Sequence, residues 1–260
     1  MRNSKNASAL ATVAAVLAMP LAANAVPIYT SWGSLPGATF GGTGIPNDAV
    51  AKTDVFINGT TQVTLALTAH GRYSNPAVTN NGAGDYYAGT GSNCGIATDP
   101  IGCPSASQGA LWNFAYYINV SGTDPAFNDF ADFTFTLYYD FDPGAGTAFG
   151  SLGTINVNNA LIGLGYTPST ITLAQDSQNL MFSAFSTSVP FTVAPPAYGP
   201  FNANATGEYN FYIGFTANNL PTFSGAVGID VNVVPVPAAV WLFGSGVALL
   251  GLMRRRAHDA

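Results

Sequence analysis

The sequence predicts an all-β protein built as a two-sheet antiparallel sandwich, and three observations support this fold class. Gly and Pro account for 29 and 17 of the 260 residues, whereas charged residues make up only 8% of the chain, against about 25% in an average soluble protein. Apolar and polar residues alternate with a period of two in several segments. No helical crossover separates these segments, so neighbouring strands are expected to pair antiparallel. A jelly-roll and an immunoglobulin-like topology both fit this pattern.

The clearest alternation runs from Asp132 to Asp142 and predicts a half-buried strand. One face carries Phe133, Phe135, Leu137, Tyr139 and Phe141, and the other carries Asp132, Thr134, Thr136, Tyr138, Asp140 and Asp142. Similar patterns predict strands at 210–216 and at 63–72, where Val63, Leu65, Leu67 and Ala69 oppose Thr64, Thr68, His70 and Arg72. Further strands are expected at 112–120, 180–187 and 227–233, separated by turn-forming clusters such as DPGAG and TNNGAG.

The first 25 residues have the composition of a secretory signal peptide. A basic start precedes an apolar run, and the run ends in the small-x-small sequence Ala23-Asn24-Ala25. We expect export through the Sec translocon and cleavage between Ala25 and Val26. This leaves one secreted domain over residues 26–233, a length that all-β domains commonly reach as a single unit.

The C-terminal tail, residues 234–256, reads VPVPAAVWLFGSGVALLGLMRRR. Its apolar part, at about 238–253, is long enough to form a single transmembrane helix. The three arginines at 254–256 are expected to stay on the cytoplasmic side, with the preceding domain outside. Pro235 and Pro237 should end the preceding strand, because proline lacks a backbone donor.

This tail resembles the PEP-CTERM sorting signal of Gram-negative bacteria, in which a short proline motif, an apolar helix and a basic cluster follow one another. It is most similar to the variant with the motif V-P-L-P-A, here Val234, Pro235, Val236, Pro237 and Ala238, with Arg254, Arg255 and Arg256 as the basic stop. The resemblance implies transient anchoring in the inner membrane and recognition by an exosortase. It further implies release or attachment at the cell surface, the outer envelope or an exopolysaccharide matrix. Val236 departs from the glutamate of the name-giving motif and from the leucine of the variant.

Cys94 and Cys103 are the only cysteines of the chain, and they lie in a segment rich in Gly, Pro and Ser. In an oxidising compartment we expect them to form a disulfide. The bond would stabilise the fold by about 2 to 3 kcal/mol in the chain-entropy description. A metal site would need more ligands than this segment offers, since His70 is the only histidine outside the tail.

The charge of the secreted domain excludes one class of partner. The chain has thirteen acidic residues, and all of them except Asp259 lie in the domain. The basic residues of the domain are Lys52 and Arg72, so twelve negative and two positive charges give a net charge of −10. Binding of nucleic acid depends on lysine and arginine at phosphates, so no nucleic-acid partner is expected. Direct binding of an acidic polysaccharide is disfavoured for the same reason.

Asp140 and Asp142 project from one strand face before a turn, and Asp132 lies at the beginning of the same segment. Clustered carboxylates beside carbonyl-rich turns suit calcium, which is the one cofactor that the sequence allows for. The spacing matches neither an EF-hand loop nor a glycine-rich nonapeptide repeat. The alternative is that these aspartates cover a solvated strand and cap turns.

The sequence assigns no catalytic and no cofactor-binding residue. Two carboxylates at i and i+2 of a strand satisfy the spacing of a glycosidase, but any acidic strand does so. His70 is expected on the exposed face of its strand, and no G-x-S-x-G motif is present. Trp112, Tyr138, Tyr198 and Tyr212 could stack on sugar rings, or they could shield the sheets and fill the core.

These observations predict an exported, surface-sorted β-sandwich with a structural or adhesive role in the envelope or exopolysaccharide matrix, without catalysis. The first alternative is a calcium- or carbohydrate-binding module. The second alternative is an extracellular hydrolase.

Overall fold

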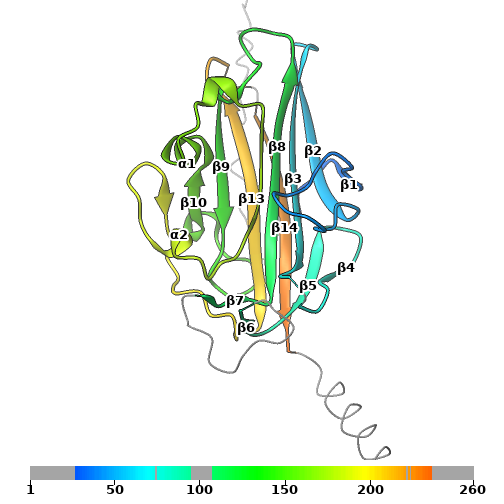
Figure 1. The fold of residues 1–260 in the computed structure, drawn as a ribbon, viewed down its shortest axis with the longest axis vertical. Helices are drawn as coiled ribbons and strands as arrows, with labels where there is room; N and C mark the ends of the chain where they lie inside the picture. The colour runs from blue at the N-terminus through cyan, green and yellow to red at the C-terminus, as the bar shows by residue number, and fades with distance from the viewer. Residues whose placement is uncertain (1–26, 74, 95–106, 221, 223, 236–260) are drawn as a thin grey trace, which may run out of the picture.

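The computed structural model describes residues 27–73, 75–94, 107–220, 222 and 224–235. These residues form a mostly β structure in which two large sheets enclose a common core, so the predicted sandwich arrangement is confirmed (Figure 1). The expected signal peptide, with Ala25 and Val26, lies outside the described residues.

The five-stranded sheet has the order β1-β2-β3-β8-β11 and is antiparallel throughout. Its strands are β1 (Ser31–Gly33), β2 (Val50–Ile57), β3 (Thr61–Gly71), β8 (Trp112–Gly122) and β11 (Leu173–Gln178). The register aligns His70 of β3 with Asn113 of β8, and Ala115 of β8 with Ser177 of β11. Polar side chains from three strands therefore meet near one end of this sheet.

The seven-stranded sheet has the order β12-β10-β9-β13-β14-β5-β4. Its strands are β12 (Val193–Ala194), β10 (Gly153–Asn156), β9 (Phe133–Tyr139), β13 (Gly207–Ala217), β14 (Ser224–Val234), β5 (Asp85–Gly89) and β4 (Thr79–Asn80). β14 pairs with β5 in parallel, which departs from the fully antiparallel sandwich that we expected. The two strands are far apart in the sequence, so no hairpin dictates their relative direction.

The remaining elements are short. They are β6 (Ser92–Asn93), β7 (Gly109–Ala110), α1 (Val157–Gly163), α2 (Ser183–Ser186) and the 3-10 helices η2 (Phe130–Asp132), η3 (Phe149–Ser151) and η4 (Pro168–Thr170). β6 and β7 pair as a separate small sheet. The Asn156 side chain caps α1 by accepting from the Asn159 N–H, which is a local signal for a helix start.

The core between the sheets is rich in phenylalanine. In β9 the predicted alternation is confirmed, because Phe133, Phe135, Leu137 and Tyr139 are buried and the intervening residues are partly exposed. Phe114 of β8 stacks on Phe211 of β13, with ring centroids 4.3 Å apart, and so joins the two sheets. Full burial of a ring of this size is worth about 2 to 3 kcal/mol.

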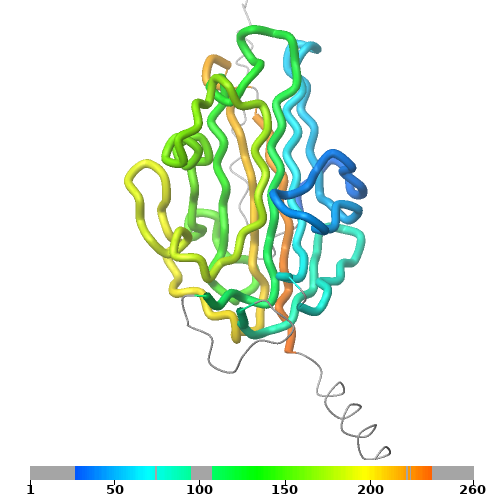
Figure 2. Tube along the Cα trace, in the orientation of Figure 1, coloured from blue at the N-terminus to red at the C-terminus, as the bar shows by residue number. Residues whose placement is uncertain are grey.

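Both faces of β3 are buried, contrary to the expectation of one solvated face. Residues 34–49, which we call the covering segment, lie across the outer face of the five-stranded sheet and are drawn in blue in Figure 2. A second, smaller core forms between this segment and the sheet. The covering segment contributes Ala38 and Phe40 to it, and the strands contribute Val50, Ala66 and Ala115. The polar residues Thr64, Thr68 and His70 are consequently buried instead of exposed. Arg72 is buried as well, beside Gly109 and the Asn93 carbonyl.

The prediction of a strand at 180–187 is wrong. The edge strand is β11, which ends at Gln178, and a turn and α2 follow it. The side-chain oxygen of Asn179 accepts from the Met181 N–H, and this bond turns the backbone out of the extended conformation.

At the C-terminal end, β14 stops at Val234 and Pro235 follows it, which agrees with a strand end at the proline motif. Residues 236–260, which hold the rest of the motif, the expected transmembrane helix and the arginine cluster, lie outside the described residues. Within the described part of the chain, no helix has the length and apolar character needed to cross a membrane. Cys94 is not a free thiol, whereas Cys103 is outside the described residues, so their pairing stays a prediction.

Candidate functional site

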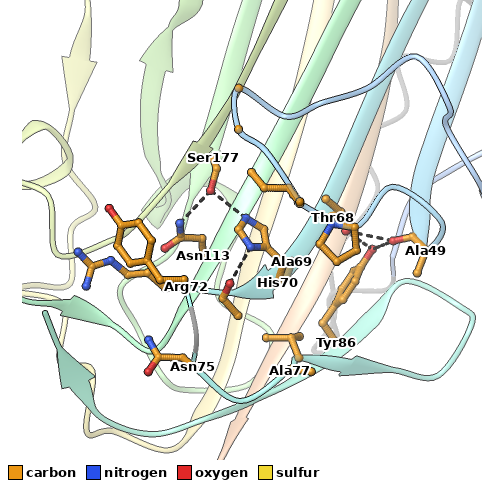
Figure 3. A pocket seen from close by; sticks show the side chains of 18 of the residues that line it. Ala49, Thr68, Ala69, His70, Arg72, Asn75, Ala77, Tyr86, Asn113 and Ser177 are labelled. Atoms are coloured by element: carbon orange, nitrogen blue, oxygen red, sulfur yellow. Dashed lines mark hydrogen bonds between the residues drawn. The ribbon is translucent and has the colours of Figure 1, made fainter. Parts of the chain in front are cut away.

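The outer face of the five-stranded sheet holds a cavity of about 690 Å³, which we call the outer cavity. Its walls are the end of β3, the covering segment, the loop at 75–80 and the ends of β8 and β11 (Figure 3). Its polar lining residues include Thr43, Asp48, Thr68, His70, Arg72, Asn75, Asn80, Asn113, Asp176 and Ser177. Apolar residues that line it include Ile45, Ala69, Ala77, Val78 and Phe182.

His70 and Ser177 form the central contact of the outer cavity. His70 Nε2 lies 2.8 Å from Ser177 Oγ, and His70 Nδ1 lies 2.9 Å from the Gly71 carbonyl oxygen (Figure 3). A carbonyl oxygen can only accept, so a neutral His70 carries its proton on Nδ1. Nε2 is then an acceptor, and the Ser177 hydroxyl donates to it.

Asn113 fixes the other side of the Ser177 hydroxyl. Its Nδ2 donates to Ser177 Oγ at 2.8 Å, and its Oδ1 accepts from Asn179 Nδ2 at 2.7 Å. Asn179 is fully buried, and its side chain also bonds the backbone N–H and carbonyl of Ala110. Because Asn179 is held in this way, it sets the orientation of the Asn113 amide. The hydrogen bonds therefore run in one direction from Asn179 through Ser177 to the imidazole.

The arrangement depends on a small residue in the strand between His70 and Ser177. β8 separates β3 from β11, so the two outer strands lie about 10 Å apart. Ala115 of β8 pairs with both Thr68 and Ser177 in the register. Its methyl side chain leaves room for the imidazole to reach across the strand, which a larger residue would block.

Burial controls the protonation of the cavity. It lowers the pKa of His70 below the ordinary value, and the bond to the Gly71 carbonyl opposes this shift. Burial also raises the pKa of Asp176, while the Ser177 N–H and the Gln178 amide favour its ionised form. His70 is only 7% exposed, and its ring is accordingly neutral at neutral pH.

Arg72 and Tyr73 form one edge of the outer cavity. Arg72 is buried and donates from Nη1 to the Asn93 carbonyl oxygen at 2.7 Å. Its Cζ lies 4.9 Å from the centroid of the Tyr73 ring, and Tyr73 is 75% exposed. The carboxylates of Asp48 and Asp176 lie on other walls, so one positive and two negative side chains line the cavity.

The covering segment is fastened to β11 at the rim of the cavity. Gln175 Oε1 accepts from the N–H groups of both Thr39 and Phe40, each at 2.8 Å. Phe40 has a φ of 49° and Gly41 a φ of 74°. A Cβ on Gly41 would lie 2.9 Å from an Asp176 carboxylate oxygen, so this position needs glycine for close approach as well as for its backbone conformation.

The structure separates the three aspartates that the sequence grouped as a calcium site. Asp132 lies in η2 before β9, whereas Asp140 and Asp142 follow β9, and the strand between them is roughly 24 Å long. Asp132 accepts from the backbone N–H groups of Asn128 and Asp129 and so completes a capping box. Asp142 accepts from the Gly144 N–H in the turn, as the alternative interpretation expected.

Asp140 belongs instead to a polar row on the outer face of the seven-stranded sheet. In the register of β9 and β13, Tyr139 pairs with Phe211, so the next residue, Asp140, comes beside Asn210. Asn210 in turn pairs with Asp230 of β14. Asn210 Nδ2 donates to Asp230 Oδ1 at 2.8 Å. Burial raises the pKa of Asp140 to about 6 and that of Asp230 to about 7. Asp140 is thus buried, not solvated.

The aromatic residues that the sequence singled out lie in different places. Trp112 is buried in the core, as the structural alternative expected. Tyr138 and Tyr212 both contact the ring of Phe149, with centroid distances of 4.5 and 5.9 Å, and so shield the seven-stranded sheet. Tyr198 is exposed. None of the four lines the outer cavity, whose exposed aromatic residues are Tyr73 and Phe182.

Sequence reasoning missed Ser177, and it placed His70 in solvent. The two residues are 107 positions apart, and nothing in a period-two pattern indicates that they meet. The only available signal was the stretch DSQN at 176–179, where four polar residues end a strand.

Within the described residues, no group of three or more His, Cys, Asp or Glu side chains is placed to hold a metal ion. The outer cavity offers hydroxyl, amide, imidazole and guanidinium groups, which suit hydrogen bonding to a polar organic ligand. Comparison of the chain with family models, with curated proteins and with solved structures gives no match.

Proposed function

We propose that this chain is an exported, surface-sorted protein that binds a neutral glycan in the outer cavity and thereby acts as an adhesive component of the cell surface or the exopolysaccharide matrix. Export through the Sec translocon and processing by an exosortase belong to the proposal, on the evidence of the two terminal segments. The observation that carries the binding function is the convergence of polar side chains from three strands on one cavity.

The chemistry of the lining favours sugar hydroxyls. A sugar hydroxyl both donates and accepts, and the cavity presents side chains of both kinds, including the exposed Thr43 hydroxyl and the exposed Asp48 carboxylate. The exposed ring of Tyr73 lies at the edge, where an aromatic face can pack on a pyranose. Three other polar residues of the lining, His70, Asn113 and Ser177, stand on strands, which hold them in fixed positions.

The charge supports a neutral ligand. One guanidinium and two carboxylates line the cavity, and the secreted domain as a whole has a net charge of −10, from twelve acids against Lys52 and Arg72. An acidic polysaccharide would be repelled by this surface. A neutral glycan would not be repelled, and directional hydrogen bonds in a partly dry site would stabilise its complex.

The test is affinity electrophoresis and calorimetry with neutral polysaccharides, namely dextran, galactomannan and a β-glucan, and with alginate as an acidic comparison. Ala77→Trp should fill the cavity without removing a hydrogen bond, because Ala77 is exposed and lines it. Ala145→Trp adds the same ring in an exposed turn after β9 and is the matched control. We expect Ala77→Trp to weaken binding by at least about tenfold and the control to bind like the wild type. Absence of binding by the wild type to every neutral glycan would contradict the proposal, as would equal binding by both variants.

A further inference from the structure

We propose that Ser177 and His70 act as nucleophile and general base, and that they hydrolyse a small acyl ester carried by the glycan in the outer cavity. The nature of the acylated substrate rests on the proposed function. The assignment of the two residues rests on the hydrogen-bond geometry alone, and the tests below separate the two.

The first step of the argument is the direction of the hydrogen bonds. A serine hydroxyl becomes a nucleophile when a base accepts its proton, and the base must in turn be held in the correct tautomer. His70 Nε2 lies 2.8 Å from Ser177 Oγ, and the Gly71 carbonyl, 2.9 Å from Nδ1, fixes the proton on the far nitrogen. The backbone carbonyl thus takes the place that an orienting carboxylate has in a catalytic triad.

The second step is access. An acyl substrate must be able to reach the serine oxygen from open space. Here the Ser177–His70 pair lines a cavity of about 690 Å³, and Ser177 is partly exposed (Figure 3). A carbonyl carbon can therefore approach Oγ from the cavity while the imidazole stays buried.

The reaction balances with water as the only co-reactant. Ser177 Oγ attacks the acyl carbon, and its proton moves to His70 Nε2. The ester C–O bond breaks, and the same proton passes to the alcohol oxygen of the departing sugar. Water then attacks the acyl-serine, His70 accepts its proton, and collapse of this second intermediate releases the carboxylic acid and returns the proton to Oγ.

Asn113 supplies the donor that such a reaction needs beside the nucleophile. Its Nδ2 lies 2.8 Å from Ser177 Oγ, and its Oδ1 is held by Asn179. When Oγ forms the new bond, this N–H is placed to donate to the oxyanion derived from the carbonyl. Asn113 is therefore expected to affect turnover more strongly than binding.

The surroundings limit the acyl group and set the pH range. Ala49, Ala77 and Val78 are small apolar residues that line the cavity, and they suit a short chain such as acetyl better than a fatty acyl chain. The charged residues that line the cavity together with the pair are Arg72, which follows β3, Asp176 on β11 and Asp48 on the covering segment. Burial lowers the pKa of His70, so its imidazole is neutral at neutral pH, as a general base requires.

The experiment treats the full chain with a fluorophosphonate probe and locates the adduct by intact mass and peptide mapping. The variants are Ser177→Ala, His70→Asn and, as the matched control, Ser169→Ala, which removes an exposed hydroxyl in η4. We expect one adduct, on Ser177, and at least about a hundredfold slower labelling in His70→Asn, with the control unchanged. Hydrolysis of p-nitrophenyl acetate should fall in parallel.

The outcomes are distinct. No adduct on Ser177 in the wild-type chain overturns the inference, whether or not the variants fold. Labelling that is equally fast in a folded His70→Asn chain, as judged by circular dichroism, assigns no base role to His70 and also overturns it. Glycan binding by the wild-type chain is measured separately. Glycan binding without labelling of Ser177 leaves the proposed function standing and overturns the inference, whereas labelling of Ser177 without glycan binding removes only the glycan from the inference.

Discussion

His70 illustrates how the surroundings of one side chain decide its chemistry. Its place between Thr68 and Arg72 in an alternating strand predicts an exposed, ordinary imidazole. Once the covering segment lies over the sheet, the same ring is buried, neutral and hydrogen-bonded to Ser177. Both nitrogens have partners, so the burial does not leave an unsatisfied polar group.

Asp230 is expected to make the folded state less stable as pH rises. Burial, followed by the charges of Glu208 and Asp85, raises its pKa from 3.8 to about 7, and the Asn210 amide opposes the shift. Between these two values the folded chain binds more protons than the unfolded chain. The stability contributed by the protonated carboxyl is therefore complete below the lower value and is lost as pH rises through the higher one.

Asp230→Asn should remove this dependence. At about pH 8 we expect the free energy of unfolding to increase by about 1 to 3 kcal/mol, because a neutral amide replaces a buried carboxylate. Urea denaturation at about pH 5 and about pH 8 measures the change. Asp48→Asn, which neutralises an exposed carboxylate on the covering segment, reports the effect of net charge. A variant that is less stable than the wild type at both pH values would refute the burial argument.

The covering segment shows how an element without regular structure can organise a site. Residues 34–49 contain no strand or helix, yet Phe40 and Ala38 build a separate core on the sheet. The amide of Gln175 holds two successive N–H groups of the segment. The segment is therefore attached at one polar point and one apolar cluster, and it forms a wall of the outer cavity.

Gln175→Ala should loosen this element selectively. Two N–H groups lose their acceptor, the exposed one of Thr39 and the partly buried one of Phe40, and the loss costs about 1 to 3 kcal/mol. We expect faster hydrogen exchange at residues 38–42 and weaker glycan binding, with β9 and β13 unchanged. Gln178→Ala is the matched control, since the Gln178 amide bonds Asp176 on its own strand and not the segment. Uniform acceleration of exchange over the whole domain would argue against a local role.

At the scale of the whole molecule, the two terminal segments predict how the chain is processed. The intact mass of the protein recovered from the cell surface and medium should correspond to a chain that begins at Val26 and ends between Pro235 and Ala238. Two hydrogens should be missing for the bond between Cys94 and Cys103. Recovery from membranes alone, with Arg254 to Arg256 still present, would mean that the tail is a permanent anchor and would end the exosortase interpretation.

The sandwich arrangement could be predicted because its signal is local. Alternation in 132–142 reports which residues of one strand share a face, and β9 follows it. The same rule failed at 180–187, where Asn179 turns the backbone by a side-chain bond that periodicity does not register. It also failed for the outer face of β3, because the residues that cover this face come from another part of the chain.

The order of the residues along the chain was enough to establish the β class and the inward face of β9, and to predict the two sorting segments, since each is a property of neighbouring residues. The folded chain alone decided the outer cavity, the burial of His70 and the separation of Asp132 from Asp140. The reason is distance in the sequence: 107 positions separate His70 from Ser177, and 135 separate Gln175 from Phe40. Only strand register and packing bring such residues within hydrogen-bonding distance, and no local pattern encodes either.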